Sequence, residues 1–463
     1  MRRNFLRTAA IALLCVATLF SCGKDGTDGK NGTNGTNGAD GTDGADGVAP
    51  VLIEIVNSLQ SVDIALGETA AVTFRVNPSN ASVPTGTGVA IADWSLDQTG
   101  TLTKASYVTA PDIFELASIQ PDGNKTGQYI ATIRQTGEDD DLSVSTYMMA
   151  LVLSVEGTGL VSSATFTLSP KIDILTCMYQ DGGGDRLIAM LPDGTGRKML
   201  YSSDAFGLIH PSIGSDGKTL LFTSGADVYS YNLVSRTLTK LTSTNEEYYV
   251  PVFSPDMSKV YVLYRDQEGV ESFISINVAT KAVTVIDNEN RVIYPSFTAD
   301  GKIVCNPGWQ EHVGIMNADG TGLTLLREAD EYTCYIHPLA VPALNKIVYV
   351  EQDDNAGTYN VRVMNTDGSG DALLAGPEGN QLSSPSANAQ GTKLAYFRST
   401  GGGKVGNIIV GDFNGTALSN ATAVFSYAEE SILIWRPQFH RISKAAYNTL
   451  DDLYTYHIIY FNR

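Results

Sequence analysis

A proline-centred segment recurs six times in the C-terminal part of the chain, and this repeat limits the fold more than any other feature. The three clearest copies begin at Pro211, Pro251 and Pro295, each with an aspartate five residues later and an apolar segment after it. Weaker copies begin at Pro338, Pro385 and Pro437. Successive copies lie 40, 44, 43, 47 and 52 residues apart, which suits one four-stranded blade per copy. The repeat predicts a β-propeller, with six blades favoured and seven as the alternative.

Several repeats continue with a second predicted strand that ends in an Asp-Gly turn. The pairs are Asp193-Gly194, Asp319-Gly320 and Asp367-Gly368, and a third strand follows, for example at 323–327. Glycine supplies the positive φ that tight hairpin turns require. The Asp-Gly pairs are therefore explained by folding alone and indicate no chemistry.

The repeat also carries a family resemblance. Segments 254–256, 215–218 and 316–322 read Ser-Pro-Asp, Ser-Asp-Gly-Lys and Met-Asn-Ala-Asp-Gly-Thr-Gly. They resemble the WD-like repeats of TolB-type propellers, which are periplasmic and bind partners, and the resemblance covers residues 171–463. It implies that residues 436–439 close a first blade begun by residues 174–179. Two further strands are expected at 445–447 and 455–461. Because the closure does not need them, a propeller of seven blades remains the alternative.

Residues 50–170 predict a second all-β region. Apolar residues alternate through 51–56 and 68–76, and turn formers follow at 77–80. The stretch 65–78 resembles the opening strands of bacterial immunoglobulin-like domains. Gly127-Gln128-Tyr129 resembles the entry to a late sandwich strand, and the last strand is expected at 162–168. The predicted fold is all-β: an Ig-like β-sandwich followed by a β-propeller. An acidic run at 138–141 offers oxygen ligands for calcium, although a solvated loop is the simpler interpretation.

The first 21 residues indicate a secretory signal. Arg2, Arg3 and Arg7 precede an apolar run at 9–20 that is too short to span a membrane. Leu19-Phe20-Ser21-Cys22-Gly23 resembles the lipobox of bacterial lipoproteins, which implies that Cys22 becomes the lipid-bearing first residue. Ordinary cleavage and an uncleaved anchor are the alternatives. Lys24-Asp25 resembles a signal that sends Gram-negative lipoproteins to the outer face of the outer membrane.

Residues 22–49 predict a spacer. Glycine occupies every third position from Gly23 to Gly47, the period of a collagen triple helix, but no proline lies between these glycines. A flexible polar tether is the simpler interpretation, and in either case the segment separates the folded part from a lipid surface.

The charge balance excludes one class of partner. Lys and Arg total 31 against 50 Asp and Glu, a net charge of −19 that becomes −22 after loss of the three signal-peptide arginines. So acidic a protein repels nucleic-acid phosphates, and no nucleic-acid partner is expected. Cys177 and Cys305 lie in apolar segments and are expected to be buried. A Cys305 to Cys334 disulfide is left open.

Candidate binding residues lie where the blades converge. The residue before each blade proline is expected to be extended and to start an innermost strand near one mouth of the channel. The six residues are His210, Val250, Tyr294, His337, Ser384 and Arg436. His210, Tyr294, His337 and Arg436 are the candidate ligand-binding set, for an anionic or sugar-like ligand. The alternative is a polar cap bonded to water and to itself.

No catalytic residues, metal or cofactor are expected. The chain lacks the Gly-x-Ser-x-Gly elbow, the phosphate loop and the dinucleotide fingerprint. The candidate set offers two histidines but no carboxylate, which are too few ligands to indicate a metal site. The favoured function is an outer-membrane lipoprotein, at the cell surface rather than on the periplasmic side, whose propeller binds a protein or glycan partner. A polysaccharide lyase or hydrolase using the channel mouth is the alternative, because some oligogalacturonate lyases use a similar propeller. A purely structural spacer is the third possibility.

Overall fold

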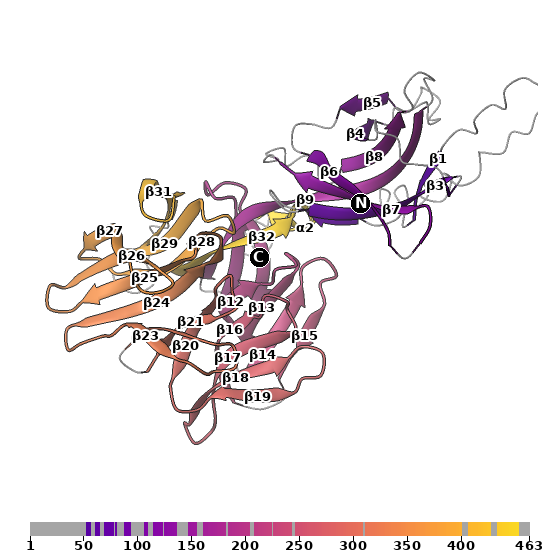
Figure 1. Cartoon of the computed structure of the whole chain (residues 1–463). Coiled ribbons are helices and arrows are strands. Elements are labelled where there is room, and N and C mark those ends of the chain that lie inside the picture. Colours follow the sequence, from indigo (N-terminus) through magenta and orange to yellow (C-terminus); the bar gives the residue numbers. More distant parts are fainter. Residues whose placement is uncertain are drawn as a thin grey trace, which may run out of the picture. The chain divides into compact units, whose positions relative to one another are not determined.

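The structure is a computed structural model, and Figure 1 shows its strands. It describes residues 52–56, 61–64, 69–77, 79–80, 88–93, 106–109, 114–123, 125–136, 147–154, 161–181, 184–203, 208–224, 226–242, 246–308, 311–400, 406–426 and 433–452. The expected signal with Cys22, the tether and the acidic run at 138–141 lie outside these residues. None of the described helices combines the length and apolar character needed to cross a membrane.

The first described sheet has the order β1 (Leu52–Ile55), β3 (Thr69–Asn77), β7 (Gln128–Gln135) and β6 (Phe114–Pro121). Along β3, Ala70, Val72, Phe74 and Val76 are buried, while the residues between them are exposed or half-buried. This alternation buries one face of the sheet, and the ring of Phe74 stacks on Tyr129 with centroids 5.6 Å apart. The expected alternating strands are therefore present, and the immunoglobulin-like assignment stays a prediction.

A long strand, β9 (Val161–Asp181), is shared by two groups of strands. Its first part pairs with β8 (Tyr147–Ser154), which pairs with β4 (Gly88–Asp93) and through it with β5 (Ser106–Thr109). The short β2 (Ser61–Ile64) runs parallel to β9. The last part of β9 pairs with β10 (Gly184–Met190). The boundary expected between residues 170 and 171 therefore falls within one continuous strand.

Five four-stranded antiparallel sheets follow, each in simple chain order. They are β12 (Leu208–Ile213), β13 (Thr219–Ser224), β14 (Asp227–Asn232), β15 (Leu238–Lys240); β16 (Glu247–Phe253), β17 (Lys259–Arg265), β18 (Glu271–Asn277), β19 (Val283–Asp287); β20 (Val292–Phe297), β21 (Ile303–Pro307), β22 (Val313–Met316), β23 (Thr324–Arg327); β24 (Thr333–Val341), β25 (Lys346–Asp353), β26 (Thr358–Asn365), β27 (Ala372–Glu378); and β28 (Leu382–Ala387), β29 (Lys393–Ser399), β30 (Gly406–Phe413), β31 (Leu418–Ser426). A 3-10 turn, η1 (Pro342–Leu344), joins β24 to β25. Each repeat thus folds as one sheet, and its proline lies in the innermost strand.

Part of the nine-stranded sheet that contains β9 joins the two ends of the repeat region. β32 (Leu433–Ser443) pairs with β9, which continues through β10 to β11 (Lys198–Ser203) and the short β33 (Asp451–Asp452). Gln438 lies opposite Thr176 and Phe439 opposite Leu175, so the expected closure is confirmed. The strand expected at 445–447 is wrong: these residues belong to α2 (Lys444–Asn448), because Ser443 Oγ caps the helix by accepting the Ala446 N–H at 3.2 Å. The strand expected at 455–461 lies outside the described residues.

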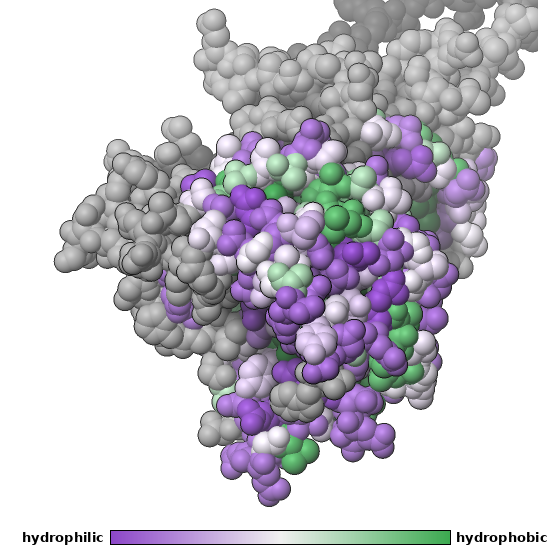
Figure 2. All heavy atoms as spheres, turned by 90° about the vertical axis from the view of Figure 1, so that its left-hand side faces the viewer, coloured by the Kyte–Doolittle hydropathy of each residue, from purple (hydrophilic) through white to green (hydrophobic). Residues whose placement is uncertain are grey.

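The innermost strands form a closed ring. Each of β12, β16, β20, β24, β28 and β32 contacts the next, and β32 contacts β12. Serines directly after the repeat prolines hydrogen-bond across these junctions: Ser296 Oγ accepts the Ala340 N–H at 2.9 Å, and Ser386 Oγ accepts the Phe439 N–H at 2.8 Å. The described residues thus form a β-propeller with six sheets around its centre. On the face seen in Figure 2, the coloured surface is mostly hydrophilic and broken by hydrophobic patches, as on a solvated surface.

The Asp-Gly pairs form tight turns that the aspartate side chains stabilise. Asp193, Asp319 and Asp367 each accept the backbone N–H two residues later, at 2.8, 3.0 and 2.9 Å. The following glycines have φ of +82°, +90° and +84°. A Cβ at Gly320 would lie 2.2 Å from the carbonyl oxygen of Ile286 in β19, on the preceding sheet. The interpretation that these pairs serve folding is confirmed, and they also allow close contact between sheets.

The described cysteines are free thiols. Cys177 and Cys305 are buried, as expected, and each belongs to a hydrophobic cluster. Cys334 is half-buried and is not bonded to Cys305. The disulfide left open above is therefore not formed.

Candidate binding site

In every innermost strand, the ladder of hydrogen bonds to the neighbouring strand is interrupted at the repeat proline. The register of each inner strand against its neighbour shifts across the residue before the proline and the proline itself. Proline has no N–H to donate to the ladder, so a bulge at this position is the natural solution. Six equivalent bulges thus surround the centre of the propeller.

The residue before each proline has a left-handed backbone. The φ values of His210, Val250, Tyr294, His337, Ser384 and Arg436 lie between +52° and +56°. The expectation that these residues are extended is therefore wrong, because the chain crosses the bulge through the left-handed region. This conformation costs a residue other than glycine about 1 to 2 kcal/mol, and glycine occupies none of the six positions.

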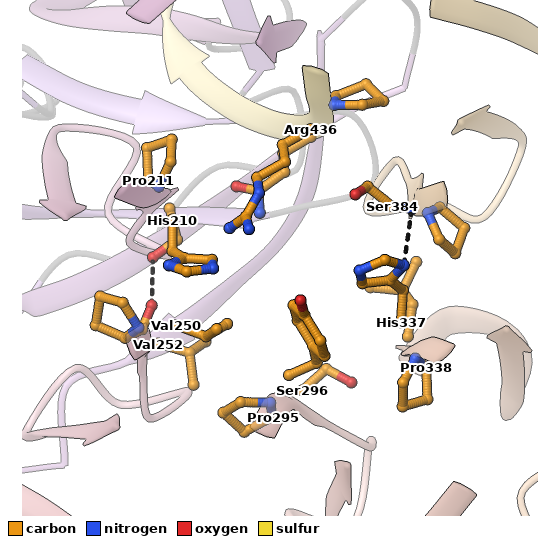
Figure 3. Close-up of a pocket in the computed structure, with 17 residues that line it drawn as sticks. His210, Pro211, Val250, Val252, Pro295, Ser296, His337, Pro338, Ser384 and Arg436 are labelled. Carbon is orange, nitrogen blue, oxygen red and sulfur yellow. Dashed lines mark hydrogen bonds between the residues drawn. The ribbon is translucent and has the colours of Figure 1, made fainter. Parts of the chain in front are cut away.

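All six of these residues line one pocket of about 120 Å³ at the centre of the ring. The structure thus brings together His210, Tyr294, His337 and Arg436, while their role in binding stays a prediction. The ring of Tyr294 meets His337 edge to face with centroids 4.5 Å apart, and it lies 6.4 Å from the ring of His210. Figure 3 shows the side chains of His210, His337 and Arg436 directed toward the space between them.

The imidazole of His337 is held as a neutral donor. Its Nδ1 accepts the backbone N–H of Ser384 at 3.4 Å, drawn as a dashed line in Figure 3. The ring hydrogen therefore resides on Nε2, the nitrogen free to donate to a ligand. Burial lowers the pKa of His337 to about 4, so the ring stays uncharged near neutral pH.

Asn306 positions His337, and the sequence analysis missed it. Asn306 Oδ1 accepts the backbone N–H of His337 at 3.1 Å, and its Nδ2 donates to the carbonyl oxygens of His312 at 2.5 Å and Tyr335 at 2.7 Å. The side chain thus links β21 of one sheet to the bulge in β24 of the next. A fully buried asparagine within an apolar strand was the available signal.

The guanidinium of Arg436 is the positive charge of this pocket. Among the described residues, no side chain makes a hydrogen bond or ion pair with it, and the residues lining the pocket include no carboxylate. Burial lowers the pKa of Arg436 to about 10, which still leaves the group charged at neutral pH. Burial, followed by the nearby charge of Glu311, raises the pKa of Tyr294 to about 12, so its phenol keeps its hydrogen.

Two residues of the pocket lining each have a side-chain atom that is buried without a partner. These atoms are Nδ1 of His210 and Oε1 of Gln438. A larger pocket of about 530 Å³ beside Asp173, Lys393 and Asp412 differs in this respect. There Lys393 pairs with Asp412 at 2.6 Å, and Asp173 pairs with Arg441 at 3.0 Å. The central pocket is therefore the one whose polar groups are left for a ligand to satisfy.

The lowered pKa of His337 predicts a pH-dependent stability. Because its pKa in the folded state is below the ordinary value near 6.5, the unfolded chain binds the proton first as the pH falls. The contribution is complete above pH 6.5 and is lost toward pH 4, at up to about 1.4 kcal/mol per pH unit. Between pH 6.5 and pH 5, wild type should therefore lose about 1.6 kcal/mol more unfolding free energy than His337→Gln. Urea unfolding at both pH values measures this difference, and equal losses in the two proteins would show that His337 titrates normally.

Comparison with known proteins gives structural similarity alone. No family model matches the chain, and neither does any curated protein. TolB from Acinetobacter baumannii is similar with a TM-score of 0.46 and 16% identity, over 57% of this chain and 66% of that one. A chain of the nidogen/laminin complex is similar with a TM-score of 0.44 and 12% identity, over 58% and 98%. An oligogalacturonate lyase from Vibrio parahaemolyticus is similar with a TM-score of 0.40 and 10% identity, over 80% and 88%. This chain is an all-β protein with a β-propeller, as its own strand order establishes.

Proposed function

We propose that this protein is a lipid-anchored binding protein of a Gram-negative outer membrane whose propeller pocket binds an acidic group on a protein or glycan partner. The observation that carries the proposal is the unpaired guanidinium of Arg436 in a pocket lined without a carboxylate. A half-buried charge without a partner is costly, and an anionic ligand offsets that cost.

The pocket chemistry suits a carboxylate. A guanidinium holds a carboxylate through two parallel hydrogen bonds. The Nε2–H of His337 and the hydroxyl of Tyr294 are further donors that carry no competing negative charge. The left-handed backbone at each position also supports a functional role, because strained residues cluster where their side chains are used.

The partner itself is the first test. Cross-linking mass spectrometry on intact cells and a glycan array with purified protein would identify what the propeller binds. We expect Arg436→Ala to lose that partner and Arg134→Ala to retain it, since Arg134 lies on β7 in an exposed ion pair with Glu115. A partner retained equally by both variants would contradict the proposal.

The membrane anchor is tested separately. Wild-type protein should incorporate labelled fatty acid and remain in the membrane fraction, whereas Cys22→Ala should do neither, because the lipid is attached at that sulfur and amino group. Cys15→Ala is the matched control, since this cysteine lies within the apolar run of the expected signal. Unlabelled wild-type protein in the soluble fraction would contradict the anchor. Protease treatment of intact cells then separates a surface location from a periplasmic one.

The enzyme alternative has its own assay. Full-length protein would be incubated with a panel of polysaccharides and the cleavage products measured. Turnover that disappears in both His210→Ala and His337→Ala would favour a lyase or hydrolase over a binding protein. The absence of a carboxylate from the pocket lining favours binding, because hydrolysis of glycosidic bonds ordinarily uses two carboxyl groups.

A further inference from the structure

We propose that the central pocket takes the free C-terminal carboxylate of a polypeptide partner, together with the amide N–H of its last residue. This inference rests on the proposed function and narrows it to one kind of ligand. Three features of the pocket carry the inference: its volume, its unpartnered acceptor and its apolar lining.

The volume limits what can enter. The pocket measures about 120 Å³, whereas a cavity of about 150 Å³ accommodates benzene. A uronic acid has a six-membered ring that carries a carboxylate and several hydroxyls, so it is larger than benzene. The terminal carboxylate of a peptide, its α-carbon and a small side chain need less space. The pocket is therefore too small to enclose a sugar acid and large enough for a chain end.

The hydrogen-bonding groups select a ligand that has both acceptors and a donor. Arg436 and the Nε2–H of His337 are donors for two carboxylate oxygens. Gln438 belongs to the pocket lining, and its Oε1 is an acceptor that is buried without a partner, so a turn of this side chain would present the acceptor to a ligand. Acetate or an acidic side chain has no N–H for this atom. The C-terminal residue of a polypeptide has an amide N–H next to its carboxylate. It can therefore accept hydrogen bonds from Arg436 and His337 and donate one to Gln438.

The remaining lining suits a small, uncharged terminal residue. Val250, Val252, Leu339 and the repeat prolines contribute apolar surface to the pocket. The structure therefore favours an apolar last residue over an acidic one.

The test compares four small probes against the detergent-solubilised full-length protein by calorimetric titration. The probes are N-acetyl-dialanine as the free acid, the same dipeptide as the C-terminal amide, acetate and glucuronate. We expect the free acid to bind about ten- to hundred-fold more tightly than the amide, because the amide loses the paired charge. It should also bind at least about ten-fold more tightly than acetate or glucuronate.

A variant separates the amide contact from simple anion binding. Gln438→Met keeps the length of the side chain but removes the acceptor, and circular dichroism checks its fold. It should weaken the free dipeptide about five- to ten-fold and leave acetate unchanged. Equal binding of the acid and the amide would overturn the inference, as would glucuronate or acetate binding as tightly as the acid. In the last two cases the proposed carboxylate site survives, whereas failure of every carboxylate would overturn the proposed function as well.

Discussion

Gly320→Ala should lower the free energy of unfolding by about 3 kcal/mol or more. At this position φ is +90°, and a Cβ would lie 2.2 Å from the carbonyl oxygen of Ile286. The obstacle is backbone in the preceding sheet, so it cannot rotate away as a flexible side chain would. Alanine therefore adds the cost of the left-handed backbone to that of separating two propeller sheets.

Gly301→Ala is the matched control for this change. Gly301 also has a positive φ, +79°, but a Cβ there has no atom within 4 Å. It should cost about 1 kcal/mol, the conformational term alone. Chemical unfolding of both variants at one pH measures the difference. Equal losses would contradict the account of the Asp-Gly turns as contacts between sheets.

Arg436→Ala should weaken binding of an acidic ligand about ten- to hundred-fold. The guanidinium is the positive charge in the pocket lining, and because the group is half-buried, less water competes for it than at an exposed position. Arg436→Lys should recover part of the affinity, because it keeps the positive charge but cannot form two parallel hydrogen bonds to one carboxylate. Titration of each variant with the same ligand measures this, and circular dichroism checks that the fold is intact. Affinity within two-fold of wild type for Arg436→Ala would place the binding site elsewhere.

Salt dependence distinguishes the ligand classes in the same experiment. A net charge of −22 after removal of residues 1–21 repels an acidic ligand at long range. Added salt screens that repulsion, so affinity for an acidic ligand should rise with salt. A nearly flat response would indicate a neutral sugar and contradict the proposed carboxylate.

The propeller could be predicted because five of its sheets, from β12 to β31, are each local in sequence. A blade needs neighbouring strands joined by short turns, so the spacing from Pro211 to Pro437 carries its signature directly. The closure of 436–439 on 174–179 spans most of the region, and the family resemblance supplied it. The equivalent place of the six residues before the prolines also followed from the repeat, since equivalent positions in a ring face the same centre.

The details of the pocket depend on contacts that a local pattern does not contain. The rule for residues before proline predicts an extended backbone, but the ladder breaks at each proline and the left-handed bulge prevails. Asn306 lies 31 residues before His337, and its role follows from the neighbouring sheet. Helix α2 depends on its cap at Ser443, whereas the apolar residues at 445–447 suggested a strand.

The most direct measurement is a crystal structure of the protein with the tightest-binding carboxylate probe. We expect both carboxylate oxygens to lie about 2.8 Å from guanidinium nitrogens of Arg436, with one oxygen also accepting from His337 Nε2. A carboxylate bound outside the central pocket, with Arg436 left unpaired, would contradict this expectation.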